Sequence, residues 1–182
     1  NKQGERIAFD ISPVNIIMNE YARILGKNYD ANGDIAASGK TIPALLKKLS
    51  SIKYYSQKPP KSLGREWVER EMKPILAEYA SETIADMLNT LSVHIGAEIG
   101  KAIGSCGKVL ITGGGAYNKF LIDNIRRNCN SEIIIPDDTT INYKEAIIFA
   151  FLGLLRICGK NNCLSSITGA RNDSCCGVVA VG

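Results

Sequence analysis

The chain has 182 residues, of which 45% are hydrophobic and 22% are charged, and its formal net charge is +4. This hydrophobic content is enough for one compact domain with its own core. The positive charge is small and dispersed, unlike the basic face of nucleic-acid-binding proteins, so no nucleic-acid partner is expected. The longest apolar run, residues 146–155, is well short of the roughly 18 to 20 residues that span a bilayer, and no signal peptide opens the chain. These features predict a cytoplasmic protein without a membrane partner.

Cysteine and histidine are the candidate metal ligands. The six cysteines lie at positions 106, 129, 158, 163, 175 and 176. They lack C-x-x-C spacing, and the single histidine, His94, is predicted to be an ordinary residue in the middle of a helix, so no metal site is expected. Because the chain is large and carries no secretion signal, we expect reduced, mostly buried thiols.

The first predicted element is a strand over residues 6–9, which ends at Asp10. A helix is expected to follow, with Ser12 as its N-cap and Pro13 at the first helical position, where the missing N–H costs nothing. Gly26 is expected to end this helix. Asp10 would then lie between the end of a strand and the start of a helix.

The middle of the chain is predicted to contain two helices joined by loops. A turn at residues 32–33 marks a loop, and a short helix is expected over 42–50. Prolines punctuate residues 54–67, which are therefore expected to be extended. A long helix is predicted over 81–103, because its apolar residues recur at three- and four-residue steps and form one stripe.

The last third is predicted to alternate strands and helices. Strand 108–112, helix 117–128 and strand 132–135 form a strand–helix–strand unit, whose crossover makes the two strands parallel. The helix over 144–157 is apolar nearly all round and is expected to be buried on both sides, and residues 175–182 are expected to add a short strand. This alternation predicts an α/β layered domain.

Three adjacent glycines, Gly113, Gly114 and Gly115, follow the strand over 108–112. In open α/β sheets, ligands bind outside the carboxyl ends of the strands, where helix N-termini present free N–H groups. Without Cβ atoms, the glycines would let a flat or anionic ligand touch the backbone. A close packing turn between strand and helix explains them equally well.

Two known glycine motifs match only in part. A P-loop needs lysine followed by serine or threonine, which this stretch lacks, and the Rossmann fingerprint needs glycine where this chain has Asn118. Asp137 and Asp138 follow the next strand, near the position at which dinucleotide-binding domains have the acidic residue that binds the ribose. A dinucleotide-binding domain therefore stays open as an alternative.

Two carboxylates are candidates for chemistry. Asp10 would share an edge of the sheet with the glycines if its strand ran parallel to strand 108–112, and a carboxylate there can accept a proton from water or a hydroxyl. Its structural alternative is to cap the following helix. Glu145 opens the predicted helix over 144–157. The helix dipole already favours an acid at this position, which is the structural explanation. The functional alternative is that Glu145 points into a cleft and binds ligand hydroxyls.

Six ordered motifs cover essentially the whole chain: "AFDISPVN", "YDANGDIAASGK", "PPKSLGREW", "LITGGGAYNKFL", "KEAIIFAFLG" and "SSITGA". Together they resemble the C-terminal half of anhydro-N-acetylmuramic acid kinases, members of the sugar-kinase, Hsp70 and actin superfamily. The resemblance implies a ribonuclease H-like α/β domain over 1–182, with a central mixed sheet flanked by helices. It also implies that the N-terminal half of the kinase is absent.

The resemblance implies a reaction and assigns residues to it. In the family, ATP with Mg²⁺ phosphorylates the 6-oxygen of the amino sugar while water opens the 1,6-anhydro ring, yielding N-acetylmuramic acid 6-phosphate for cell-wall recycling. Asp10 matches the catalytic aspartate of a D-T-G-P-G-N motif, and Asn15 ends that motif and is assigned to substrate. Glu145 matches a sugar-binding glutamate, and Gly113–Gly115 with Asn118 match the adenosine-side nucleotide motif.

The match departs from the family motif at Ile11, Ser12 and Val14, which replace threonine and two glycines. These differences leave open the alternative that the protein is a relative that binds nucleotide or sugar without catalysis. The phosphate-binding loops of the family lie in the N-terminal half, so residues 1–182 alone are expected to be inactive. The resemblance also implies a homodimer for the intact kinase.

Overall fold

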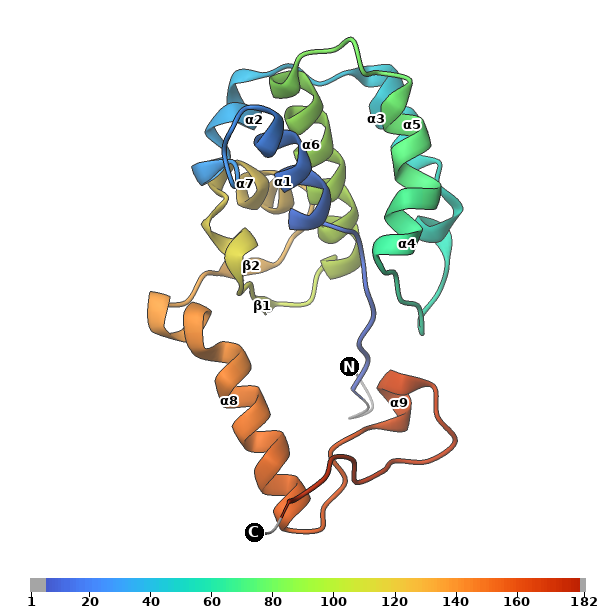
Figure 1. Cartoon of the computed structure of the whole chain (residues 1–182), viewed down its shortest axis with the longest axis vertical. Coiled ribbons are helices and arrows are strands. Elements are labelled where there is room, and N and C mark those ends of the chain that lie inside the picture. Colours follow the sequence, from blue (N-terminus) through green and yellow to red (C-terminus); the bar gives the residue numbers. More distant parts are fainter. Residues whose placement is uncertain (1–5, 181–182) are drawn as a thin grey trace. The chain divides into compact units, whose positions relative to one another are not determined.

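The computed structural model describes residues 6–180, which divide into two compact units (Figure 1). The larger unit comprises residues 10–57 and 63–136, and the smaller unit comprises residues 6–9, 58–62 and 137–180. The chain is α/β, with helices and a small parallel sheet.

The larger unit holds most of the helices and both strands. Its elements in chain order are α1 (Asn15–Ile24), η1 (Ala31–Gly33), α2 (Asp34–Ser38), α3 (Pro43–Ser50), η2 (Lys53–Ser56), α4 (Arg65–Trp67), η3 (Val68–Met72), α5 (Lys73–Ala77), α6 (Ile84–Ile103), β1 (Lys108–Leu110), η4 (Gly114–Tyr117), α7 (Lys119–Arg127) and β2 (Glu132–Ile134). The smaller unit holds α8 (Asp138–Ile157) and α9 (Ser165–Thr168).

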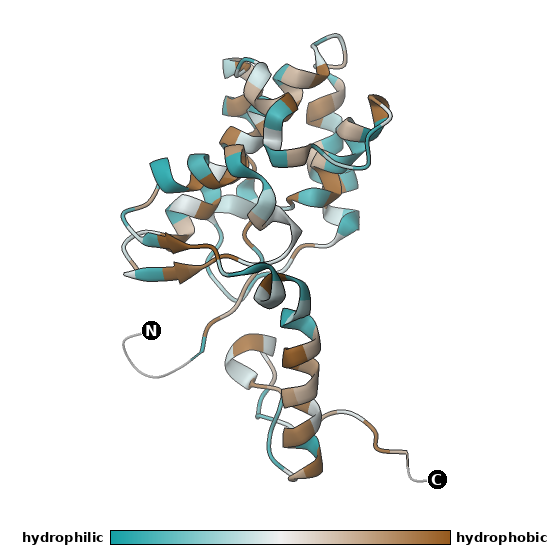
Figure 2. Cartoon of the chain, turned by 90° about the vertical axis from the view of Figure 1, so that its left-hand side faces the viewer, coloured by the Kyte–Doolittle hydropathy of each residue, from teal (hydrophilic) through white to brown (hydrophobic). Residues whose placement is uncertain are grey.

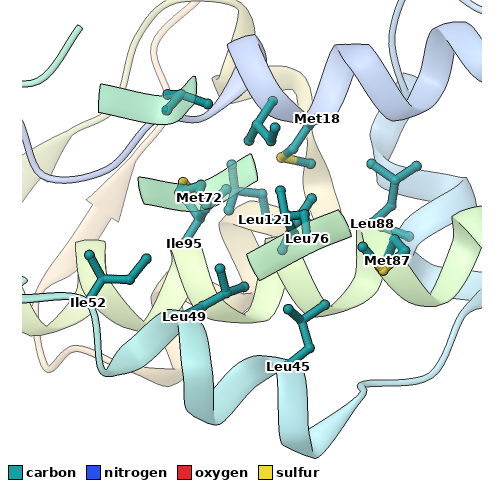
Figure 3. Close-up of a cluster of buried hydrophobic side chains, with 14 of the residues drawn as sticks. Met18, Leu45, Leu49, Ile52, Met72, Leu76, Met87, Leu88, Ile95 and Leu121 are labelled. Atoms are coloured by element: carbon teal, nitrogen blue, oxygen red, sulfur yellow. The ribbon is translucent and has the colours of Figure 1, made fainter. Parts of the chain in front are cut away.

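The long helix α6 is the centre of the larger unit. Thr83 is its N-cap and accepts a hydrogen bond from Asp86 N at 3.1 Å. Helices α1, α2, α3 and α7 all contact α6, so its predicted apolar stripe is buried from several directions. Figure 3 shows the resulting core, which includes Met18, Leu45, Leu49, Ile52, Met72, Leu76, Met87, Leu88, Ile95 and Leu121. The predicted stripe is thus confirmed as the core-facing side of α6.

The strands β1 and β2 pair in parallel, with Val109 opposite Ile133, and α7 connects them. This arrangement confirms the predicted strand–helix–strand unit. Among residues 6–180 the sheet has these two strands, which is smaller than the central mixed sheet that was expected. The strand expected over residues 6–9 is wrong, because that segment pairs with no other strand among the described residues and so has no ladder to join.

The start of α1 differs from the prediction. The helix begins at Asn15, and its N-cap is Val14, whose side chain makes no capping hydrogen bond. The predicted cap, Ser12, instead places its hydroxyl 3.2 Å from the Tyr55 hydroxyl. A long-range contact of Ser12 has therefore replaced the predicted local cap. At its other end, the helix stops before Gly26, as expected.

Two segments for which no helix was predicted contain helices. Residues 31–38 form η1 and α2, because the carboxylate of Asp30 accepts hydrogen bonds from Ile35 N and Ala36 N, both at 2.9 Å. Residues 65–77 form α4, η3 and α5, and they bury Trp67, Val68, Met72 and Leu76 in the core. The four-residue spacing of Val68, Met72 and Leu76 places these three side chains on one face of a helical path.

Helix α8 starts earlier and is more exposed than predicted. It begins at Asp138 rather than at residue 144, because Asp137 caps it by accepting a hydrogen bond from Thr140 N at 3.0 Å. The expected burial on both sides is wrong: Figure 2 shows hydrophobic residues along α8, and Phe149 is 70% exposed and Ile157 75% exposed. Every helix among residues 6–180 is too short or too polar to span a bilayer.

The C-terminal tail and the cysteines also differ from expectation. Residues 175–180 form no strand, and residues 181–182 lie outside the described residues. All six cysteines are free thiols, but none is fully buried: Cys106, Cys158 and Cys176 are exposed and the other three are half-buried. The prediction of mostly buried thiols is therefore wrong.

His94 lies in the middle of α6, as expected, and is fully buried. Its ring packs edge-on against Tyr55 at 4.8 Å, and its Nε2 has no hydrogen-bond partner in the part of the chain that the structure describes. Burial lowers the pKa of His94 from 6.5 to about 4, because the charged form cannot be solvated there.

The low pKa of His94 predicts a loss of stability in mild acid. Between pH 6.5 and 4 the unfolded chain binds a proton that the folded chain does not, so stability is full above pH 6.5 and falls as the pH falls. From pH 7.5 to 5.0 we expect the free energy of unfolding to fall by about 2 kcal/mol. Urea unfolding followed by the fluorescence of Trp67 would measure this change. The leucine in His94→Leu does not titrate, so the free energy of unfolding of this variant should depend less on pH by the same amount. An unchanged pH dependence would contradict the assignment to His94.

Candidate functional site

A cavity of about 240 Å³ in the larger unit is the candidate functional site. Its lining comes from the start of α1, the segment around η1, and the turn between β1 and α7. The lining residues are Asn15, Met18, Asn19, Tyr29, Asp30, Asn32, Gly114, Tyr117 and Asn118. Three residues that the sequence had singled out, Asn15, Gly114 and Asn118, therefore meet at one cavity.

The three adjacent glycines have three different positions. Gly113 has a φ of +82°, which L side chains rarely adopt, and it turns the chain out of β1. Gly114 lines the cavity, and a Cβ atom placed on it would lie 3.5 Å from Asn15 Nδ2. Gly115 faces Val14 instead, with its Cβ position 3.8 Å from Val14 Cγ1. Only Gly114 of the three brings bare backbone to the cavity.

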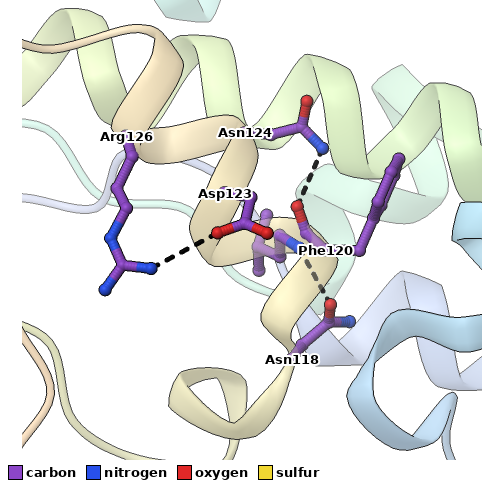
Figure 4. A network of polar contacts seen from close by, with 6 residues as sticks. Asn118, Phe120, Asp123, Asn124 and Arg126 are labelled. Atoms are coloured by element: carbon purple, nitrogen blue, oxygen red, sulfur yellow. Dashed lines mark hydrogen bonds and ion pairs between the residues drawn. The ribbon is translucent and has the colours of Figure 1, made fainter.

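Asn118 holds the start of α7 in place (Figure 4). Its Oδ1 accepts a hydrogen bond from Leu121 N at 2.9 Å, so it is the N-cap of the helix, and the residue is buried. Gly33 packs directly against this carboxamide, and any Cβ at Gly33 would collide with Asn118 Oδ1. This packing fixes the orientation of Asn118 and explains why asparagine stands where the Rossmann fingerprint has glycine.

Two tyrosines supply aromatic surface at the cavity. Tyr29 is 63% exposed and Tyr117 is 44% exposed, so both rings are accessible to a ligand. Nothing in the sequence marks these tyrosines as site residues, although each lies within a quoted motif next to a glycine or asparagine turn. Asp30 lines the same cavity, but its carboxylate is engaged by Ile35 N and Ala36 N and has a structural task.

Asp10 belongs to the larger unit but does not line this cavity. Its Oδ2 accepts a hydrogen bond from Leu63 N at 2.9 Å, and its carbonyl oxygen accepts one from the Tyr54 hydroxyl at 2.7 Å. Burial, with the nearby Asp10 charge, raises the pKa of Tyr54, which therefore stays protonated as a donor. The residue is thus held at two points, one on the carboxylate and one on the main chain, and its exposed side chain still reaches solvent.

The remaining predicted acids lie in the smaller unit. Glu145 is exposed and lies well inside α8, so the helix-dipole explanation for it is wrong. Asp137 takes the N-terminal position instead, and hydrogen bonds from Thr140 N and Thr140 Oγ1 lower its pKa. Both oxygens of Asp137 accept capping hydrogen bonds, which gives this carboxylate a structural role at the start of α8.

The described residues do not provide a protein site for a metal. Between residues 6 and 180, no group of three or more histidine, cysteine, aspartate or glutamate side chains could hold an ion. The side chains present fit a nucleoside better than a metal: amides, aromatic rings and a glycine backbone line the cavity. We therefore assign no step to Mg²⁺.

Comparison with known proteins identifies a class of phosphotransferase. The anhydro-N-acetylmuramic acid kinase of Francisella tularensis subsp. novicida is 35% identical over 91% of this chain and 46% of that protein. The kinases of the same name from Nitrosospira multiformis and Burkholderia vietnamiensis are 33% and 32% identical, over 98% and 94% of this chain and 50% and 48% of their own lengths. The model of the anhydro-N-acetylmuramic acid kinase family matches residues 2–182, so the chain belongs to that family. The chain spans about half the length of the curated relatives it matches.

Proposed function

We propose that this chain is the nucleotide-binding part of a kinase that acts on 1,6-anhydro-N-acetylmuramic acid. The kinase transfers the terminal phosphoryl group of ATP to the 6-oxygen of the sugar while water opens the anhydro ring, and the product is N-acetylmuramic acid 6-phosphate for cell-wall recycling. One observation carries the proposal: in a chain of this family, Asn15, Gly114 and Asn118 line one cavity together with two accessible tyrosines.

The size and lining of the cavity favour the adenosine end of the nucleotide. At about 240 Å³ it is smaller than the roughly 300 Å³ at which pockets for whole drug-sized ligands begin. Tyr29 and Tyr117 offer faces for a planar base, and base–aromatic stacking is worth about 1–3 kcal/mol per base. The backbone at Gly114 admits close approach, and the positive end of the α7 dipole favours phosphate nearby.

Asp10 is proposed to be the base that activates water. A carboxylate can take a proton from water as the oxygen attacks the sugar ring, and the bonds from Leu63 N and Tyr54 hold Asp10 in position for this step. Asn15 begins α1 beside the glycine turn, which supports a role at the junction between sugar and nucleotide. The sugar-binding role of Glu145 remains a proposal that rests on the family motif.

Adjacent glycines provide the experiment that tests the nucleotide pocket. We expect Gly114→Ala to weaken ADP binding to residues 1–182 by about tenfold, since a methyl group inserted at a filled contact costs about 1–3 kcal/mol. Gly115→Ala is the matched control, because its methyl group faces Val14 at an ordinary contact distance, outside the cavity lining. Isothermal titration calorimetry measures both affinities, and thermal unfolding checks that both variants are folded. Equal affinities for the two variants, or tighter binding of NAD than of ADP, would contradict the proposed pocket.

A non-catalytic relative is the second candidate. Val14, which replaces a glycine of the family motif, lies beside Gly115 and adds bulk near the glycine turn, while Ser12 bonds to Tyr55. Joining this chain to the part of a relative that it does not match, and assaying the anhydro sugar with ATP, separates the candidates. Binding of sugar and nucleotide without product would favour the non-catalytic relative.

Family membership supports the remaining parts of the proposal. The two parallel strands and flanking helices are compatible with one part of a ribonuclease H-like domain, and we propose that the other layers complete it in the whole kinase. We also propose that the complete enzyme is a cytoplasmic homodimer whose phosphate loops lie in the half that this chain lacks. In that half, Mg²⁺ would bind together with the triphosphate.

A further inference from the structure

Four of the six cysteines follow the end of α8, and three of them, Cys163, Cys175 and Cys176, are gathered around one bridge. Cys163 pairs with Ser174 in an antiparallel bridge, with Cys163 N donating to Ser174 O at 3.0 Å and Ser174 N donating to Cys163 O at 2.9 Å. Cys175 and Cys176 come directly after this bridge. Figure 1 shows the segment returning past α9 toward the end of α8. The bridge therefore brings cysteines from two separate stretches of the sequence together.

The side chain of Asn162 fixes the backbone of Cys176. Asn162 Oδ1 accepts a hydrogen bond from Cys176 N at 2.7 Å, and Asn162 Nδ2 donates to Cys176 O at 3.0 Å. The same Nδ2 also donates to Leu152 O at 3.2 Å, which ties this arrangement to α8. Cys176 is thus held at a defined position beside Cys163, although it belongs to no strand.

The thiols of Cys163 and Cys176 lie on backbone segments that the bridge and Asn162 hold together, and they have different chemical environments. Hydrogen bonds from Ser174, whose Oγ lies 3.3 Å from the sulfur, and from Cys163 lower the pKa of Cys176, and the charge of Arg156 adds to this effect. The bond to Cys176 raises the pKa of Cys163. Cys176 is exposed and Cys163 is half-buried. An accessible thiol with a lowered pKa, beside a second thiol with a raised pKa, is the usual environment of a redox-active cysteine pair.

We propose that Cys176 and Cys163 form a peroxide-sensitive modification site that closes reversibly to a disulfide. The oxidant is a hydroperoxide such as hydrogen peroxide. The Cys176 thiolate attacks one peroxide oxygen, the O–O bond breaks, and Cys176 becomes a sulfenic acid while the leaving hydroxide takes up a proton to form water. The sulfur of Cys163 then attacks the sulfur of Cys176, which forms the S–S bond and releases a second water. Two thiols lose two electrons in total, and a dithiol reductant returns them.

The geometry selects Cys163 as the partner rather than the neighbouring Cys175. Cys175 is directed to another contact, since its sulfur accepts a hydrogen bond from Arg156 Nη1 at 3.5 Å. Closing the pair requires the two sulfurs to approach to about 2.05 Å. Residues 177–180 are exposed and form no helix or strand, so no regular element after Cys176 opposes this approach.

Arg171 lies between the two cysteines and makes the bridge easy to detect. Trypsin cuts after Lys160 and Arg171, so Cys163 falls in peptide 161–171 and Cys176 in peptide 172–182. After treatment of the reduced 182-residue chain with hydrogen peroxide and alkylation of the remaining thiols, we expect these two peptides to be joined, with two hydrogens less than the sum of their masses. A dithiol should separate them again.

Single variants identify which thiols take part. We expect Cys163→Ser and Cys176→Ser each to lose the joined peptides, while Cys163→Ser keeps a sulfenic acid at position 176 that dimedone traps. Cys175→Ser and Cys106→Ser should both retain the joined peptides, and they serve as controls for a neighbouring and a distant thiol. A disulfide within peptide 172–182, joined peptides that survive in Cys176→Ser, or faster oxidation of Cys106 than of Cys176 would each overturn the proposal.

Discussion

Exchange of Asp10 for asparagine is expected to lower the turnover of the proposed kinase by about 10²- to 10⁴-fold, the usual contribution of a positioned general base. Asparagine has nearly the shape of aspartate but cannot take a proton from water. The variant also keeps an oxygen that can accept the hydrogen bond from Leu63 N, and the bond from Tyr54 to the main chain is unaffected. The loss should therefore fall on the chemical step and not on folding.

The measurement requires an active enzyme, which can be made by joining this chain to the portion of the Francisella relative that it does not match. Product formation from the anhydro sugar is compared for the parent, Asp10→Asn and Asp123→Asn. Asp123 is a matched control, because it is a carboxylate of the same unit that pairs with Arg126 at 3.3 Å, on α7. Near-normal turnover in Asp10→Asn, with Asp123→Asn also active, would remove Asp10 from the mechanism.

The elements that the sequence predicted well are those whose signals are local. Strand β1, helix α7 and strand β2 follow from two apolar runs and a glycine turn within fewer than 30 residues. Helix α6 follows from its apolar stripe alone. Parallel pairing of the strands follows from the crossover rule, and the structure confirms it.

The elements that were missed depend on contacts distant in sequence. Ser12 is a good N-cap residue by type, but its hydroxyl meets Tyr55, and α1 starts later. The helical path over residues 65–77 is stabilised by burial of Trp67 and Met72 in the common core, and the nearby prolines concealed its apolar spacing. Local propensity is a weak guide wherever tertiary packing supplies more energy.

The candidate site was partly predictable for a related reason. The family motif singled out Asn15, Gly114 and Asn118, and the structure places all three at one cavity. The motif alone could not distinguish the roles of the three glycines, because these roles depend on which part of the folded chain each glycine faces. Tyr29 and Tyr117 carry no local signal for ligand binding, and they join the site only through folding of the segment around η1 onto the glycine turn.

Residues 1–182 alone are expected to show no detectable phosphorylation of 1,6-anhydro-N-acetylmuramic acid. Phosphoryl transfer depends on positioning the phosphates and neutralising their charge around Mg²⁺. Residues 6–180 contain no cluster of acidic, histidine or cysteine side chains that could hold the ion, and the candidate cavity is large enough for the nucleoside end only. The chain also spans only about half the length of its relatives.

The same chain should bind ADP weakly and self-associate. Large apolar side chains of α8, among them Ile147, Phe149 and Phe151, are exposed, and exposed apolar patches beyond a few hundred Å² tend to recruit partners or aggregate. Light scattering measures association while a coupled assay measures ATP-dependent product, each with and without the complementary portion of a relative added in trans. Activity should appear, and scattering should fall, only when that portion is present, since the phosphates and the apolar face of α8 then gain their partners. A monomeric, active chain would show that residues 1–182 hold the phosphates by themselves, and the assignment of the phosphate loops to the other half would then be wrong.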